Sequence, residues 1–427
     1  MHYVRPLSLV AIALLLFVAA QGTGIELFFH LSYLLVSIVL VAYLWVWLNL
    51  RGLSVRREVF TRRAQVGDVM RERITLINHW FLPKLWIEVI DRSNLPDHSV
   101  GFVTYLPGYE QRRQVIRTPC TMRGKFRLGP VTLASSDLLG LFRLQRNIAG
   151  DDEILVYPRT SPLPSFALPG AELPGGQDLR RRTHHTTPNV AAIRDYQPGD
   201  SFNRIHWRST ARLGRLIVKE FELDPTAEVY VMIDMHEYVQ LAWWPRDGRL
   251  TMRSQRTAES SEEYAVHAAA SIARHALEQN RAVGLIAWGQ RREVIPPERE
   301  ARQLYKILEA LAELRAYGSA SLAEVLSAEN ARFGRNCTLV IITPSPDERW
   351  VTGVQHLLYR GVRVVAILID AQSFGGERSN EPIRTRLAEL CVPTYTWRRG
   401  QSLEAALAQP ALASVQHTGI ATNVALS

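Results

Sequence analysis

The chain has 427 residues, and its 50 lysines and arginines exceed its 41 acidic residues to give a formal net charge of +9. With 21% charged and 47% hydrophobic residues, the composition is that of a globular protein and excludes a disordered acidic tail or a low-complexity scaffold. The charge is unevenly spread, because residues 7–50 contain one acid, Glu26, and no lysine or arginine. The basic excess is therefore interpreted first against a membrane and only then against nucleic acid.

Two apolar runs open the chain, at residues 7–20 and 25–50, with a short glycine-containing turn between them. A membrane-spanning helix needs about 20 apolar residues. The second run exceeds this length, and the first reaches it only with the help of its flanking residues. A signal peptide is the alternative for the first run, but the second run begins almost at once and would stop transfer. We expect a transmembrane helical hairpin over residues 1–50.

Positive charges flank the hairpin on both sides, whereas the turn inside it carries none. Arg5 precedes the hairpin, and five arginines follow it: Arg51, Arg56, Arg57, Arg62 and Arg63. Because positively charged flanks stay in the cytoplasm, we expect both termini and all soluble domains there. These arginines are also placed to contact anionic lipid headgroups.

Residues 51–160 show short alternating runs separated by turn residues and no helical periodicity. Strands are expected at residues 73–77, 85–90, 115–117, 131–133 and 154–157. Regularly spaced strands without helices predict a small antiparallel β-sandwich. Its expected role is spacing or interaction, since nothing in it suggests catalysis.

A linker rich in proline, glycine and arginine follows at residues 161–193. It contains the cluster Arg180, Arg181 and Arg182 and the pair His184 and His185. A basic cluster of this kind can bind nucleic acid or lipid, but it is more often a solvated linker. Two adjacent histidines without a third ligand do not predict a metal site.

The densest motif of the chain follows the linker. Its marked residues are Arg194, Tyr196, Pro198, Gly199, Asp200, Arg204, His206, Trp207, Arg208 and Arg212. Asp200 is a natural helix N-cap, which predicts a helix running to about Leu213 and closed by Gly214. On such a helix three of the arginines would share one face. Six cations and five acids over residues 194–224 favour an ion-pair network or a surface for a charged partner over a polyanion groove.

From residue 228 onward, apolar strands alternate with helices. Strands are expected at residues 229–233, 283–288, 337–342 and 362–369, and helices at 262–279, 302–314, 322–333, 351–359 and 383–390. This order predicts an α/β doubly wound domain, with a parallel sheet covered on both faces. Ligands of such folds bind at the carboxyl ends of the strands, where Asp234, Ser319 and the loop at residues 343–347 are expected.

The central motif resembles the signature of domain-of-unknown-function family 58. Residues 123–130 (RGKFRLGP) and 137–142 (DLLGLF) resemble the sandwich region of the same family. These are bacterial membrane-anchored proteins with a von Willebrand factor A-like domain, which the resemblance implies for residues 194–427. It also implies a place in the bacterial cytoplasmic membrane and association with MoxR-type AAA+ ATPases. The activity of the family is itself unsettled.

The resemblance also raises the question of a metal site. A-like domains generally hold a divalent cation with a D-x-S-x-S loop, a threonine and a second aspartate. This chain matches only Asp234, with His236 and Tyr238 in place of the serines, Ser319 as a substitute for the threonine, and Pro344 in place of the second acid. Mg²⁺ requires an octahedral set of oxygens, so we expect no metal or other cofactor. Asp234 is instead expected to cap backbone N–H groups.

Three functions remain open from the sequence. The leading one is a non-enzymatic interaction or scaffold protein, anchored in the lipid bilayer, which presents the A-like domain to a protein partner. The first alternative is a metal-assisted hydrolase that uses Asp234 and His236. The second is nucleic-acid binding through the arginine-rich linker, which the nearly balanced charges of the central motif do not favour.

Overall fold

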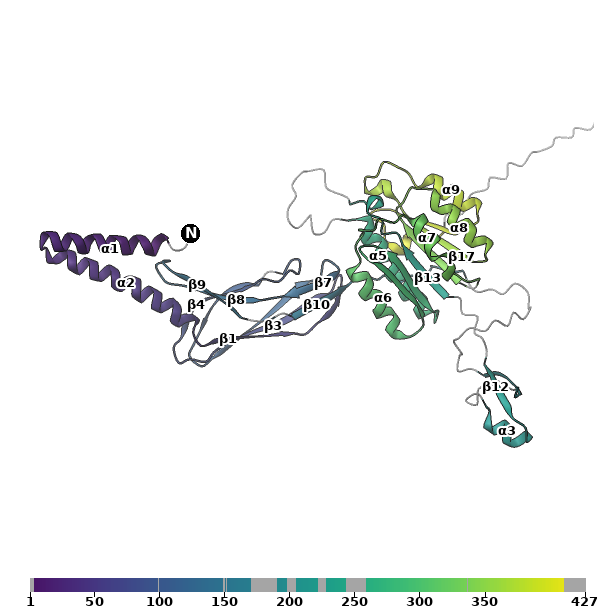
Figure 1. The fold of residues 1–427 in the computed structure, drawn as a ribbon, viewed down its shortest axis with the longest axis horizontal. Helices are drawn as coiled ribbons and strands as arrows, with labels where there is room; N and C mark the ends of the chain where they lie inside the picture. Colours follow the sequence, from purple (N-terminus) through teal and green to yellow (C-terminus); the bar gives the residue numbers. More distant parts are fainter. Residues whose placement is uncertain are drawn as a thin grey trace, which may run out of the picture. The chain divides into compact units, whose positions relative to one another are not determined.

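The computed structural model describes residues 4–98, 100–148, 150, 152–169, 190–197, 205–221, 228–242, 259–335 and 337–410 (Figure 1). The chain divides into two compact units. The first unit comprises Met1–Arg159, Trp244–Ala258 and Leu308–Leu314. The second comprises Thr160–Trp243, Glu259–Ile307 and Arg315–Ser427. The predicted linker lies largely outside the described residues.

Two apolar helices begin the first unit, α1 (Val4–Thr23) and α2 (Glu26–Leu50). They pack against each other through the edge-to-face rings of Phe17 and Phe29, with centroids 5.8 Å apart. Buried Ser32 donates a hydrogen bond of 2.9 Å to the backbone oxygen of Ala13. This bond satisfies the serine hydroxyl, which lipid chains could not do. Both helices are long and apolar enough to cross a membrane, as the sequence predicted.

The rest of the described first unit is largely strands. They are β1 (Leu53–Val59), β2 (Arg63–Gln65), β3 (Val69–Asn78), β4 (Lys84–Asp91), β5 (Gly101–Leu106), β6 (Gln111–Pro119), β7 (Gly124–Leu128), β8 (Val131–Ser136), β9 (Arg143–Ile148) and β10 (Asp152–Tyr157). They form sheets of order β1-β3-β6, β5-β4-β8-β9 and β2-β10-β7, antiparallel except for the β2–β10 pair. The strands expected within β3, β4, β6, β8 and β10 are present. Several strands that were not expected, such as β9, carry charged side chains that hide the alternation.

The core of this unit lies between the first two sheets. Ile74 and Leu76 of β3 share a buried cluster with Ile87 and Val89 of β4 and Leu133 of β8. On β3 the residues at positions 70, 72 and 74 are buried and Val69 and Arg71 are exposed, as expected for a strand with one face toward a core. The antiparallel pairing and the shared core agree with the predicted sandwich.

The second unit contains a sheet of order β15-β14-β13-β16-β17-β18. Its strands are β13 (Glu228–Ile233), β14 (Val283–Trp288), β15 (Arg292–Glu298), β16 (Cys337–Thr343), β17 (Arg363–Ile369) and β18 (Thr394–Trp397). All neighbours pair in parallel except β14 and β15. Numbered in chain order, the five parallel strands follow the spatial order 2-1-3-4-5. The chain adds β14 on one side of β13 and the later strands on the other side, so the topological switch point lies between β13 and β16. The antiparallel edge strand β15 was not expected, because its consecutive prolines argue against a strand anywhere but at an edge.

Helices and short 3₁₀ turns connect the strands of this sheet and follow the last of them. They are α5 (Ser261–Glu278), α6 (Ala301–Glu313), α7 (Leu322–Glu329), α8 (Arg349–Tyr359), α9 (Glu381–Glu389) and α10 (Leu403–Ala406), with short 3₁₀ turns η2 (Glu237–Val239), η3 (Asn330–Arg332) and η4 (Ala371–Phe374). Helices α7, α8 and α9 share one buried cluster with Tyr230 and Met232. Helix α5 packs on β13, β14, β16 and β17 with its alanine-rich face. The helix expected over 322–333 ends at Glu329 and continues only as η3.

Candidate functional site

The described residues 190–197 and 205–221, which include part of the central motif that begins at Arg194, form a small β-hairpin with a helix between its strands. Strands β11 (Val190–Asp195) and β12 (Ile217–Phe221) pair antiparallel, and α3 (Trp207–Leu213) lies between them in the chain. Ile205 forms a β-bridge with Val218, and both side chains are buried. Because Ile205 is held in this bridge, the helix begins only at Trp207.

The start of α3 corrects the sequence prediction. His206 caps the helix, since its Nδ1 atom accepts a hydrogen bond of 3.2 Å from the Ser209 N–H. The predicted cap, Asp200, therefore does not begin this helix. Of the three arginines expected on one helical face, α3 carries Arg208 and Arg212. The remaining one, Arg204, lies outside the described residues together with Pro198, Gly199 and Asp200.

Helix α3 presents an exposed surface of aromatic and basic side chains. Trp207 is 66% exposed, and Arg208 and Arg212 are exposed beside it. Gly214 closes the helix in the left-handed conformation, with φ 68°, as the sequence predicted. Arg194 lies in β11, and the backbone N–H of Tyr196 bonds to Leu216. We call Trp207, Arg208 and Arg212 the α3 surface.

A second group of polar residues lies at the carboxyl ends of β13 and β16. Asp234 is 3% exposed, and its Oδ2 atom accepts a hydrogen bond of 2.6 Å from the Thr343 hydroxyl. Its Oδ1 atom accepts one of 3.2 Å from the His236 N–H. Burial raises the pKa of Asp234, and the two hydrogen bonds oppose this shift only in part. Thr343 in turn accepts a hydrogen bond from the Ser345 N–H.

The same edge brings in the segment before Ser319. Gly318 forms a parallel bridge with His236, and a Cβ at Gly318 would lie 2.2 Å from the Trp288 backbone oxygen. Only glycine fits this approach. Ser319 follows and is exposed. The carboxylate of Asp234 thus bonds a backbone N–H, as predicted, and also the hydroxyl of Thr343, which the sequence placed at the same edge.

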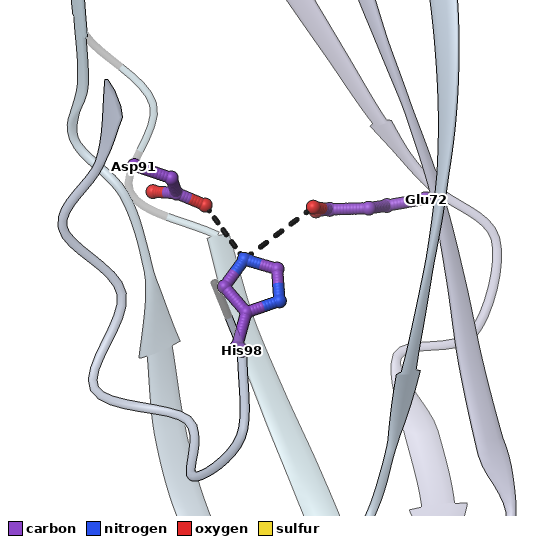
Figure 2. A group of neighbouring side chains, drawn as sticks. All are labelled: Glu72, Asp91 and His98. Carbon is purple, nitrogen blue, oxygen red and sulfur yellow. Dashed lines mark hydrogen bonds and ion pairs between the residues drawn. The ribbon is translucent and has the colours of Figure 1, made fainter. Parts of the chain in front are cut away.

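A third group, buried inside the sandwich, was not predicted. Figure 2 shows His98 between Asp91 at the end of β4 and Glu72 of β3. The Nε2 atom of His98 lies 2.8 Å from Asp91 Oδ2 and 3.5 Å from Glu72 Oε1. Its Nδ1 atom lies 2.8 Å from the Thr118 hydroxyl. The three potential metal-ligand atoms lie within 4.8 Å of one another.

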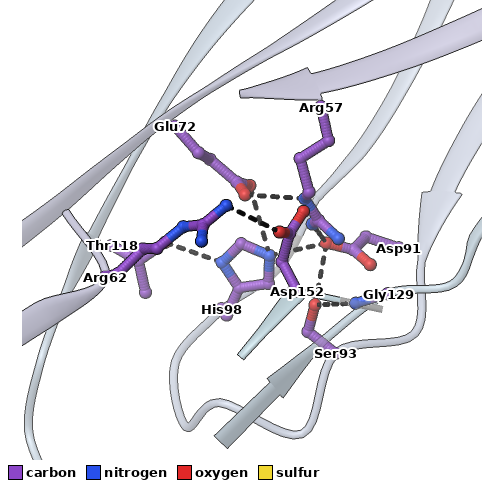
Figure 3. Close-up of polar contacts among 9 residues, drawn as sticks. All are labelled: Arg57, Arg62, Glu72, Asp91, Ser93, His98, Thr118, Gly129 and Asp152. Carbon is purple, nitrogen blue, oxygen red and sulfur yellow. Dashed lines mark hydrogen bonds and ion pairs between the residues drawn. The ribbon is translucent and has the colours of Figure 1, made fainter. Parts of the chain in front are cut away.

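An arginine supplies the positive charge of this cluster (Figure 3). Arg57 of β1 donates through Nε to Glu72 Oε2 at 2.9 Å, and its guanidinium also pairs with Asp91. Arg57 is 4% exposed, and the side chains of both acids are 0% exposed. Burial raises the pKa of Asp91, but the hydrogen bond from His98 and the charge of Arg57 outweigh it and hold that pKa below its usual value. Arg57 therefore offsets negative charge that Glu72 and Asp91 bring into the sandwich.

This cluster joins two sheets of the sandwich. Arg57 and Glu72 come from the β1-β3-β6 sheet, whereas Asp91 comes from the β5-β4-β8-β9 sheet. The sequence did contain a signal. Glu72 occupies an inward position between Met70 and Ile74 on β3, where an apolar residue is expected. We call Arg57, Glu72, Asp91 and His98 the buried cluster.

Burial of Arg57 also corrects one sequence prediction. The arginines after the hairpin were expected at lipid headgroups, but the guanidinium of Arg57 faces Glu72 and Asp91 inside the sandwich. Arg62 and Arg63 follow the far end of β1. Because β1 has seven residues, that end lies roughly 23 Å along the strand from the residues that follow α2. Of these arginines, Arg51 lies directly after α2.

Comparison with known proteins finds a family match for residues 192–372. The profile described as "Protein of unknown function DUF58" matches residues 192–372, which include α3 and the Asp234 edge. This part of the chain belongs to the DUF58 family. The uncharacterized protein YeaD of Bacillus subtilis (strain 168) is 23% identical over 317 residues, covering 72% of this chain and 73% of YeaD.

Two solved structures show weak likeness over about a quarter of the chain. A CARDB domain from Pyrococcus furiosus, solved with di-metal ions, is 13% identical with a TM-score of 0.20, covering 24% of this chain and 91% of that domain. A complex of zinc 2-glycoprotein and prolactin inducible protein from human seminal plasma is 7% identical with a TM-score of 0.19, covering 24% and 92%. These likenesses carry no argument about the DUF58 segment or its activity.

Proposed function

We propose that the chain is an interaction or scaffold protein of the bacterial cytoplasmic membrane, with both termini and its soluble domains in the cytoplasm. Helices α1 and α2 support the anchoring, since both are long and apolar enough to span. The positive residues on either side of the pair support the orientation, because the turn between the helices carries none. In this proposal the chain acts by binding and not by catalysis.

The domain that it presents is, in this proposal, von Willebrand factor A-like. The parallel strand order 2-1-3-4-5 in the second unit supports this interpretation. So does the acid Asp234 at the end of the first parallel strand, beside Thr343 at the end of the third. Asp234 then has a structural role, since its carboxylate is buried and hydrogen-bonded within the chain.

The α3 surface is the proposed contact for the partner, a MoxR-type AAA+ ATPase. The observation that carries this proposal is the exposure of Trp207 beside Arg208 and Arg212. Tryptophan and arginine are the residue types that most often dominate binding energy at protein interfaces. Neither arginine has an ion-pair partner among the residues that the structure describes, so both are available to acids of a partner.

A pull-down of the full-length protein from detergent-solubilised membranes tests this proposal. The double variant Arg208→Glu and Arg212→Glu reverses the charge of the α3 surface and should abolish capture of a MoxR-type ATPase. The matched control is Arg384→Glu with Arg386→Glu on α9, where a half-buried and an exposed arginine undergo the same change away from the α3 surface. Capture that is equal in all three proteins, or absent from the wild type, would refute the proposal.

A reporter fused after Ser427 tests the orientation independently. An enzyme that is active only in the cytoplasm should be active there. Activity of an enzyme that works only outside the cytoplasm would overturn the proposed topology without affecting the α3 surface.

A further inference from the structure

The sandwich carries exposed apolar side chains at the end that receives α2. Leu138 is 90% exposed and Leu139 is 62% exposed, in the loop between β8 and β9. Trp86 is 61% exposed at the start of β4. Apolar side chains gathered on adjoining loops mark an interaction surface. The position of these loops relative to the membrane helices indicates what they contact.

The β8–β9 loop is built to hold its leucines outward. The carboxylate of Asp137, itself buried, accepts hydrogen bonds from the N–H groups of Leu139 (2.9 Å) and Phe142 (2.6 Å). Gly140 adopts the left-handed conformation, with φ 66°. These contacts close the loop on its polar side and leave Leu138 and Leu139 without packing partners of the kind that core leucines have.

The loop touches both membrane helices. The ring of Phe142 lies edge-to-face on that of Tyr43 in α2, with centroids 5.5 Å apart. Gly140 lies against the Arg5 guanidinium near the start of α1, where a Cβ would come within 3.6 Å of it. In Figure 1 the β8–β9 loop lies beside the first residues of α1.

Helix lengths place these contacts at the membrane boundary. A hydrocarbon core of about 30 Å takes about 20 helical residues. Counted from Glu26, the first residue of α2, 20 residues end at Trp45; α1 has 20 residues in all. Tyr43 and Arg5 therefore mark the same boundary, and tyrosine, tryptophan and arginine are typical of it.

Beyond that boundary the sandwich encloses the end of α2. Val46 and Asn49 are 0% and 4% exposed, and Asn49 bonds in both directions to the backbone of Leu85, at 3.0 and 3.3 Å. Lys84 donates to the backbone oxygen of Leu48 at 2.5 Å. These bonds leave little room for the sandwich to separate from the helix end.

The first residues of β4 add another exposed apolar side chain near the end of α2. The pairing of β4 with β5 is irregular between Lys84 and Ile87, and Trp86 adopts a positive φ of 54°. An irregularity of this kind turns a side chain away from the face it would otherwise occupy. The result is an indole directed outward beside the Leu85 backbone that holds Asn49.

We propose that this apolar rim, Leu138, Leu139 and Trp86, inserts into the headgroup region of the bilayer. The sandwich then sits on the membrane surface and is not suspended from it by a flexible tether. Continuity with the spanning helices favours lipid as the occupant, because the β8–β9 loop contacts Tyr43 and Arg5 and Trp86 follows Leu85, which bonds Asn49 near the end of α2. The inference rests on the proposed membrane anchoring.

Site-directed fluorescence on the full-length protein in lipid nanodiscs tests the rim. Leu138→Cys is labelled with the environment-sensitive dye NBD in a Cys391→Ser background, where the remaining Cys120 and Cys337 are buried. The matched control is Val69→Cys, which is 50% exposed. Val69 is the first residue of β3, which is ten residues long. The other end of β3 pairs with Leu53, just after α2, so Val69 lies roughly 30 Å from the end of the sandwich that receives α2.

We expect the label at Leu138 to shift to the blue, to be quenched by nitroxide lipids and to be shielded from aqueous iodide. The label at Val69 should show the opposite behaviour. Iodide quenching at Leu138 equal to that at Val69 would overturn the proposal, as would shielding that appears only when other membrane proteins are added. Leu139→Cys repeats the test if labelling at Leu138 disturbs the fold. Carbonate extraction reports the spanning helices separately, so failure of the rim and failure of the anchoring are distinguishable.

Discussion

Loss of Arg57 should destabilise the sandwich more than loss of any exposed arginine. The variant Arg57→Met keeps most of the side-chain length but removes the charge that faces Glu72 and Asp91, whose side chains are both 0% exposed. One imidazole, His98, cannot neutralise two carboxylates. Removing one partner of a buried ion pair costs about 3–5 kcal/mol, and we expect a loss of this size.

Hydrogen exchange measures this loss within the sandwich, because the chain has more than one unit and a single melting curve would mix them. A loss of 3–5 kcal/mol should speed exchange of the slow β3 amides by about two to four orders of magnitude. The matched control is the neighbouring Arg56→Met, since Arg56 is 74% exposed and its contact with Glu58 is 3.4 Å long. Such surface pairs contribute below about 1 kcal/mol.

Equal exchange rates in the two variants would refute the electrostatic account of the buried cluster. A further variant separates charge from packing. Arg57→Met combined with Glu72→Gln and Asp91→Asn removes the opposing charges together and should recover part of the lost stability. Failure to recover any of it would mean that the contacts of Arg57 act through shape alone.

Three further predictions concern pH and packing. The folded-state pKa of Asp91 is lowered, so the stability that its carboxylate contributes to the sandwich is present above about pH 4 and is lost as the pH falls through the folded pKa. Hydrogen exchange of the sandwich amides, followed as the pH is lowered, should show this loss in the wild type and not in Asp91→Asn. Thr343→Val removes a hydrogen bond to buried Asp234 and should cost about 1–3 kcal/mol in urea unfolding of the second unit; unchanged unfolding would contradict it. Gly318→Ala places a Cβ 2.2 Å from a backbone oxygen and should speed hydrogen exchange of the slow β14 amides in the second unit, whereas Gly334→Ala, with open space around it, should not.

Elements that local sequence patterns indicate could be predicted from the sequence. The two apolar runs correspond to α1 and α2, because length and lack of charge suffice to indicate a spanning helix. Alternation was visible in β3 and β4, and Gly214 correctly marked the end of α3. Strand β15 escaped prediction because an edge strand tolerates prolines that an inner strand would exclude.

The start of α3 could not be predicted from local propensity. Asp200 is a good N-cap by residue type, but the bridge between Ile205 and Val218 holds the chain extended up to His206. A contact across the hairpin thus overrode a local preference. Of the three arginines predicted for one face of a longer helix, α3 carries Arg208 and Arg212.

The sequence by itself determined where the chain can cross a membrane and where its strands and helices alternate, because those signals depend on neighbours a few residues apart. Only the tertiary structure brought Arg57, Glu72 and Asp91 together, since these residues lie on different strands and meet through the register of long-range pairs. The same holds for the leucines at 138 and 139. Their exposure acquires meaning only because the loop that carries them contacts both membrane helices, among them Tyr43, which lies about 100 residues before Phe142 in the chain.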